Sequence, residues 1–135
     1  MTELITTKYE IKDFKDKHYH IIKNWANKRK FNLPPFEQLP PTGLIGFIDN
    51  IPVAACFLSL TDANSAILSG LITDPDFLDG EERKRLGDSL MKRLVNMAKE
   101  AGLSVFCWTF LENMKSRLTD IGFIKTEENA TFYGI

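Results

Sequence analysis

The sequence has few cysteines and no long apolar run. Cys56 and Cys107 are the only cysteines, and they lie far apart inside apolar segments without a CxxC spacing. A disulfide framework and a zinc site are therefore not expected, and buried reduced thiols are the simpler interpretation. No segment approaches the ~20 apolar residues of a membrane span, and the N-terminal residues lack the apolar stretch of a signal peptide. We expect a soluble, cytoplasmic protein that binds no metal.

An excess of either charge is also missing. The 17 Lys and Arg residues nearly balance the 18 Asp and Glu residues, which gives a formal net charge of −1. Proteins that bind nucleic acids or anionic membranes usually carry a basic excess, so neither partner is expected. The basic residues between Arg83 and Arg93 could form a local nucleic-acid patch, but acidic neighbours dilute them and a solvated helix face is the simpler interpretation. Walker A and GxSxG motifs are absent.

What is present is the composition of a globular domain. The chain has 135 residues, of which 44% are hydrophobic. This is enough to bury a core without disulfides or metals. We expect one domain that spans residues 1–135.

The first third of the chain predicts a strand, a helix and a loop. Nearly alternate apolar residues in 9–14 predict a strand, and an apolar stripe in 16–30 predicts a helix. His18 and His20 near the start of this helix are expected to be solvated or hydrogen-bonded, with a place at a substrate mouth as the alternative. Two Pro-Pro pairs in 31–43 exclude regular structure there. That segment is either a lid over a substrate groove or a packed crossover.

From residue 42 the pattern changes to strands. Apolar runs at 43–48, 53–60 and 66–73, joined by turn-forming residues, predict an antiparallel meander that is buried on both faces. A long amphipathic helix follows from about Glu82 to Ala101. The next apolar run, 104–110, should lie parallel to the last strand of the meander, because a crossover through a helix is right-handed.

These elements predict an α+β fold that resembles an α/β sandwich. A mixed, mostly antiparallel central sheet would be covered by helices on both faces. A shorter helix within 111–123 and a last strand or hairpin in the C-terminal tail would complete it.

The start of the long helix is the strongest candidate for a binding site. A strand that ends at Pro75 leads through a charged loop into a helix that opens with basic residues. The free N–H groups and the positive dipole end of a helix start attract anions. The sequence therefore predicts an anion site at this turn.

The order of elements resembles that of the GNAT family of N-acetyltransferases, particularly small bacterial and phage members, over nearly the whole chain. The family signature is Gln or Arg, two residues, Gly, one residue, then Gly or Ala, and its positions match Lys84, Gly87 and Ser89. A later family feature, an Asn followed by a short helix with a Gly-Phe ending, matches Asn113 and residues 122–123. The resemblance implies that acetyl-CoA is the co-substrate. The residues it implies in acetyl-CoA binding are Leu71, Ile72, Thr73, Arg83, Lys84, Arg85, Leu86, Gly87, Asp88, Ser89, Asn113 and Ser116.

The resemblance further implies transfer of an acetyl group to the amine of a small molecule, a protein or a nucleobase, and it allows a homodimer. The tyrosine that serves many members as the general acid is replaced by Leu118, so the catalytic residues are not identified by it. By residue type, the candidates for the acid and base are Asp62, Asp74, Glu112 and Tyr133, each of which also has a purely structural interpretation. Ser69 and Thr109 could orient a water molecule, and Trp108 could line the acceptor pocket. Because the acid is missing and the signature is altered, the alternative is a catalytically degenerate GNAT-fold protein that binds or inhibits a partner, for example one encoded by a phage.

Overall fold

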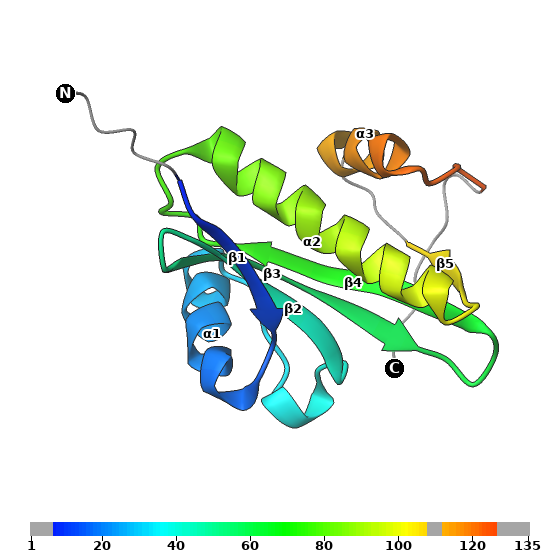
Figure 1. The fold of residues 1–135 in the computed structure, drawn as a ribbon. Coiled ribbons are helices and arrows are strands. Elements are labelled where there is room, and N and C mark those ends of the chain that lie inside the picture. The colour runs from blue at the N-terminus through cyan, green and yellow to red at the C-terminus, as the bar shows by residue number, and fades with distance from the viewer. Residues whose placement is uncertain (1–6, 108–111, 127–135) are drawn as a thin grey trace.

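The computed structural model of the chain describes residues 7–107 and 112–126. Figure 1 shows a sheet with helices on either side of it. The elements in chain order are β1 (Tyr9–Asp13), the 3-10 turn η1 (Asp16–His18), α1 (Tyr19–Lys28), the 3-10 turn η2 (Phe36–Gln38), β2 (Thr42–Ile48), β3 (Ile51–Leu60), β4 (Ser65–Thr73), α2 (Gly80–Glu100), β5 (Ser104–Phe106) and α3 (Glu112–Ile121).

The strands form one mixed sheet in the order β1-β2-β3-β4-β5. Each neighbouring pair from β1 to β4 is antiparallel, whereas β5 runs parallel to β4. The predicted meander and the parallel crossover through the long helix are both confirmed. The predicted strand at 104–110 begins as expected with β5, and its last residues, with Trp108 and Thr109, lie outside the described part of the chain.

One face of the sheet is covered by α2. Its stripe of Leu86, Leu90 and Leu94 is almost completely buried against β2, β3 and β4. Gly46 of β2 lets the helix come close, because a Cβ at this position would lie 2.8 Å from the Leu86 side chain. Each large apolar side chain buried in this way contributes about 1.5–3 kcal/mol, so the stripe fixes the helix on the sheet.

The opposite face is covered by α1 and by the proline-rich segment. Ile22 and Trp25 of α1 are buried against this face together with Phe57 of β3. The Phe36 ring of the proline-rich segment packs against the Tyr19 ring at 6.2 Å between centroids. The expected cover on both faces is therefore confirmed (Figure 1), and the proline-rich segment packs as a crossover over the core.

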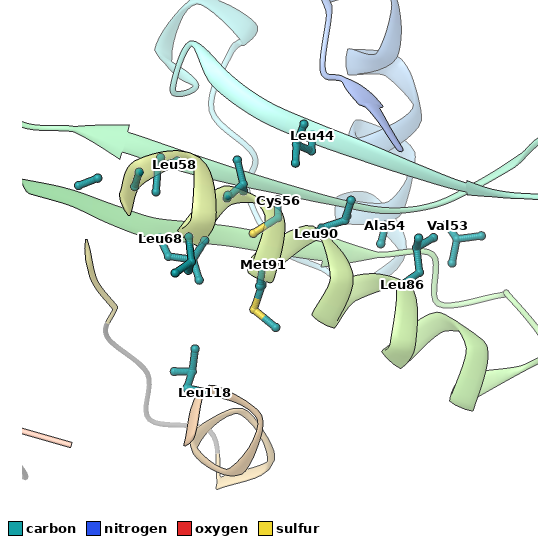
Figure 2. Close-up of a cluster of buried hydrophobic side chains, with 14 of the residues drawn as sticks. Leu44, Val53, Ala54, Cys56, Leu58, Leu68, Leu86, Leu90, Met91 and Leu118 are labelled. Atoms are coloured by element: carbon teal, nitrogen blue, oxygen red, sulfur yellow. The ribbon is translucent and has the colours of Figure 1, made fainter. Parts of the chain in front are cut away.

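The short helix α3 packs on α2 (Figure 1). Leu118 is 7% exposed and joins the core cluster of α2, where Met91 points toward it (Figure 2). The guanidinium of Arg117 donates from Nε to Oδ1 of Asp88 at 2.7 Å. The strand or hairpin predicted for the C-terminal tail falls on residues beyond the described part.

Within residues 7–107 and 112–126, none of the helices has both the length and the apolar character needed to span a bilayer. In the same residues, no three metal-ligating side chains gather into a potential site.

Candidate functional site

The far edge of β4 is paired over only part of its length. β4 pairs with β5 over three residues only, from Ser65 opposite Ser104 to Ile67 opposite Phe106. Beyond Ile67, no strand in the described part of the chain pairs with this edge. Among the described residues, none pairs as a strand with the second half of this edge, and backbone groups of this kind can pair with a ligand that has its own amide groups.

A β-bulge interrupts β4 at this place. The register of β3 and β4 shifts at Cys56, because two residues of β4, Gly70 and Leu71, lie opposite this single residue of β3. The bulge therefore adds one residue to β4. Gly70 has a φ of +65°, a left-handed conformation that suits glycine and that marks one class of bulge. The extra residue reverses the alternation of side chains, so that Leu71 packs toward α2 while Ile72 is buried on the α1 face. Bulges of this kind re-aim backbone groups beside functional sites.

The ladder beyond the bulge shows which backbone groups face outward. The N–H of Asp74 donates to the carbonyl of Val53 at 2.8 Å. In an antiparallel pair, every second residue bonds to the neighbouring strand, so Ile72 bonds to β3. We infer from the same alternation that Leu71, beside Gly70 in the bulge, presents its N–H and C=O to the open edge.

The loop between β4 and α2 is held by an arginine. The guanidinium of Arg83 donates to the carbonyls of Asp74 at 3.1 Å, Phe77 at 3.4 Å and Pro75 at 3.5 Å. This side chain, expected to contact the co-substrate, is thus engaged in shaping the loop.

The end of α1 also holds this loop and the end of β4. Lys28 forms an ion pair with Asp76, whose hydrogen bond raises the pKa of Lys28. Arg29 donates to the carbonyl of Thr73 at 3.0 Å and to its hydroxyl at 2.7 Å. The loop is therefore positioned from both faces of the sheet.

The long helix begins at Gly80, two residues earlier than predicted. Its N-cap is Asp79, whose carboxylate accepts the N–H of Glu82 at 3.1 Å. The first turn carries two glutamates, and their charges oppose an anion at the helix start. The segment from Lys84 to Ser89 lies inside the helix, where backbone N–H groups bond within the helix.

Gly87, the central residue of the signature, is buried where α3 docks on α2. A Cβ at Gly87 would lie 2.9 Å from a guanidinium nitrogen of Arg117 and 3.5 Å from Leu71. Arg117 also donates to the carbonyl of Lys84 at 3.4 Å. The missing side chain of Gly87 therefore makes room for Arg117 as well as for close packing on the bulge.

The remaining residues implied in acetyl-CoA binding occupy three environments. Leu86 is buried in the core, and Asp88 is paired with Arg117. Arg85 is paired with Glu82 at 3.1 Å. The exposed residues of the set are Lys84, Arg85, Ser89, Asn113 and Ser116.

Of the candidate acids and bases, Asp62 and Asp74 take part in turns at the two ends of β4. Asp62 lies in the turn before β4, about 20 Å along the strand from Leu71 at ~3.3 Å per residue. Asp74 accepts the N–H of Asp76 at 2.9 Å, as a turn carboxylate does. Glu112 begins α3, and Tyr133 lies outside the described residues.

The side chains of Ser69 on β4 and Cys56 on β3 lie next to the bulge. The hydroxyl of Ser69 is 3.5 Å from that of Ser59. Cys56 is also adjacent, but burial raises the pKa of its thiol to about 12. Cys56 is therefore protonated at neutral pH and is not a nucleophile, whereas the serine pair can orient a water molecule.

No family model and no curated protein matches this sequence. Solved structures do match. An acetyltransferase of the GNAT family from Staphylococcus aureus Mu50 has a TM-score of 0.70 and 12% identity over 90% of this chain and 87% of its own. A predicted acetyltransferase from Clostridium acetobutylicum, solved with acetyl-CoA, has a TM-score of 0.66 and 12% identity over 93% of this chain and 96% of its own. The ribosomal-protein-S18-alanine N-acetyltransferase from Escherichia coli has a TM-score of 0.62 and 16% identity over 89% of this chain and 80% of its own.

These likenesses establish the fold. The chain has the fold of the GNAT acetyltransferases, as its sequence predicted.

Sequence reasoning overlooked the residue that defines the open edge. The signal was present, because Gly70 stands alone inside the apolar strand 66–73, and an isolated strand glycine indicates a bulge or a close backbone approach.

Proposed function

We propose that this chain is an acetyl-CoA-dependent N-acetyltransferase that acetylates the amine of a small molecule, a protein or a nucleobase. The observation that carries the proposal is the open edge of β4 with its bulge at Gly70. The neighbour from Clostridium acetobutylicum, which was solved with acetyl-CoA, supports the choice of co-substrate.

In this proposal the co-substrate lies along the open edge of β4. The pantetheine amides pair with the strand as an added strand would, and the thioester carbonyl accepts the outward N–H of Leu71. Donors of this kind stabilise the negative charge that develops on the carbonyl oxygen during acyl transfer. A backbone N–H held by a bulge is suited to this task because it needs no reorganisation.

The reaction then needs an amine, a base and a departing thiolate. The neutral amine nitrogen attacks the thioester carbon, the C–S bond breaks, and coenzyme A leaves as a thiolate. The amine proton passes to a water molecule beside Ser69, and solvent protonates the thiolate, because Leu118 is buried where the family acid would stand. Alignment of the two reactants supplies most of the rate acceleration.

The diphosphate would lie beyond the bulge, near the start of α2. Lys84 and Arg85 are exposed there and can offer positive charge, and Ser89, Asn113 and Ser116 are exposed as well. The acidic first turn of α2 weakens this attraction. We therefore expect backbone pairing along β4 to contribute more to binding than the diphosphate contacts do.

A matched pair of glycine variants tests the site. Gly70→Ala places a side chain on a left-handed residue of the bulge, 3.3 Å from Phe57. We expect it to abolish both acetyl transfer and stabilisation by acetyl-CoA. Gly102→Ala is the control, because Gly102 also has a positive φ, +77°, but has open space around it and lies at the end of α2.

The control should lose about 1 kcal/mol of stability and keep its response to acetyl-CoA. For the wild type, an acetyl-CoA concentration a hundredfold above the Kd should stabilise the fold by about 2.7 kcal/mol. The measurement is thermal unfolding with and without acetyl-CoA. An equal response of both variants would show that the bulge is not the site.

One observation favours a second function: the groups expected to bind the co-substrate or act in catalysis are engaged in holding the fold. Arg83 holds the loop, Leu118 is buried, and the first turn of α2 is acidic. These features suit a GNAT-fold protein that has lost catalysis and binds a partner. The absence of any thermal shift with acetyl-CoA or coenzyme A would favour this function over the first.

A further inference from the structure

The other edge of the sheet is formed by β1, whose outer side has no strand neighbour in the described part of the chain. The carbonyl of Lys8 accepts the N–H of Asp49 at 2.8 Å, and the N–H of Phe14 donates to Gly43 at 2.9 Å. Every second residue from Lys8 to Phe14 therefore bonds to β2. The residues whose N–H and C=O groups face outward are Tyr9, Ile11 and Asp13.

The side chains of this edge carry an alternating charge pattern. Glu10 lies between Lys8 at 2.9 Å and Lys12 at 3.7 Å on one face of the sheet. The opposite face of β1 carries Tyr9, which is 48% exposed, Ile11, which packs at the rim of the α2 core, and the exposed Asp13. Exposed edge strands of mixed polarity can pair with another strand when the charges fit.

We propose that β1 is the dimerisation surface of this protein and pairs antiparallel with β1 of a second copy, centred on Ile11. A twofold axis at Ile11 places it opposite its own copy and places Tyr9 opposite Asp13, so every outward N–H and C=O of β1 finds a partner. Glu10 of each copy then lies opposite Lys12 of the other, which gives two attractive cross-strand pairs.

The charge pattern selects this register among its neighbours. An axis at Glu10 would place Glu10 opposite Glu10 and Lys8 opposite Lys12, and an axis at Lys12 would place two lysines opposite each other. Like charges directly opposite destabilise a strand pair. An axis at Tyr9 would pair Lys8 with Glu10 but would place Lys12 and Asp13 opposite residues 6 and 5, outside β1 as it is described, so the two β1 strands would overlap less.

The dimer also fits the rest of the molecule. Ile11 would meet Ile11 on the α2 face and remove apolar surface from water on both copies. β1 and β5 lie at opposite ends of the strand order, so the pairing leaves the open edge of β4 accessible in each copy. The dimer therefore does not depend on the proposed acetyl transfer and can be tested without it.

Charge reversal tests the surface and its register together. Sedimentation velocity of the full chain over a range of concentrations should show a monomer–dimer equilibrium. Lys12→Glu and Glu10→Lys each replace two attractive pairs by two repulsive ones and should weaken the dimer at least tenfold. The double swap Glu10→Lys with Lys12→Glu should restore it, and a mixture of the two single variants should form a heterodimer.

Lys23→Glu is the matched control, since Lys23 is exposed on α1 and carries the same change of charge away from β1. It should leave the equilibrium unchanged. Amide exchange provides a second readout, because the outward N–H groups of Tyr9, Ile11 and Asp13 should gain protection as the concentration of wild-type protein rises. Three results would each overturn the proposal. The first is a wild-type protein that stays monomeric up to a concentration of about 1 mM. The others are a dimer that Lys12→Glu does not weaken, and a dimer that the control variant weakens equally.

Discussion

His18 is hydrogen-bonded as expected, but it is buried and not exposed to solvent. His18 is 6% exposed and lies between the rings of Phe14 and Phe47. The N–H of Lys15 donates to its Nδ1 at 3.0 Å, a bond that requires an unprotonated Nδ1. The hydrogen-bonded state predicted from the sequence is therefore confirmed, but in the interior of the α1 layer instead of in solvent.

The environment of His18 makes the stability of the fold depend on pH. Burial lowers its pKa from the ordinary value of 6.5, and the positive charges of Lys17, Lys12, His20 and Lys15 lower it further. The unfolded chain therefore binds more protons than the native chain does just below pH 6.5. The stability that His18 contributes is complete above its unfolded pKa. It is lost as the pH falls from that value through the lower pKa of the folded state.

We expect the free energy of unfolding to decrease between pH 7.5 and 5.5, with a slope from His18 of up to about 1.4 kcal/mol per pH unit. Urea unfolding at several pH values measures this slope. His18→Gln should flatten it, while His20→Gln removes only one of the four neighbouring charges and should leave most of the slope. Equal slopes in wild type and His18→Gln would contradict the assignment.

At the scale of elements, the contact between α2 and α3 explains a glycine that the family signature alone assigned to phosphate binding. Gly87 leaves room for Arg117, which reaches Asp88 and the carbonyl of Lys84. The sequence matches a signature at this position, and the structure shows a second reason for the glycine.

A double-mutant cycle separates this packing role from a binding role. Gly87→Ala should destabilise the fold by about 1 kcal/mol, because the guanidinium of Arg117 must move and its bonds to Asp88 and the Lys84 carbonyl are disturbed. In an Arg117→Ala background the same substitution should be much less costly, since alanine has the better helix propensity by ~1 kcal/mol. Chemical denaturation of the four proteins gives the coupling energy. A cost that does not change with the background would show that Arg117 is not the obstacle.

Helices and strands with a regular spacing of apolar residues could be predicted from the sequence, whereas the side-chain contacts between them could not. The apolar runs of the meander and the stripe of Leu86, Leu90 and Leu94 gave the strands and α2 within two residues at each helix end. The start of α2 was misplaced because Asp79 caps the helix ahead of the basic segment. The engagement of Arg83 and Arg117 depends on contacts between segments, which no local pattern contains.

At the scale of the whole molecule, the sheet has two edges with different properties. The β4 edge contains a bulge and, among the described residues, pairs with β5 over three residues only, whereas β1 pairs with β2 without a register shift and carries alternating charges. The fold of the sheet was predictable from the order of its elements. The identity of the open edge was not, because it depends on where two parallel strands stop pairing.

The central claim is that Leu71, just past the bulge, presents its backbone to an acyl-CoA. The most direct test is the exchange and chemical shift of the Leu71 amide, followed by NMR as acetyl-CoA is added. We predict that this N–H becomes protected and shifts on binding, while the amides of the remote turn at Asp62 do not change. Acetyl-CoA binding that leaves the Leu71 amide unchanged, or no binding at all, would contradict the account.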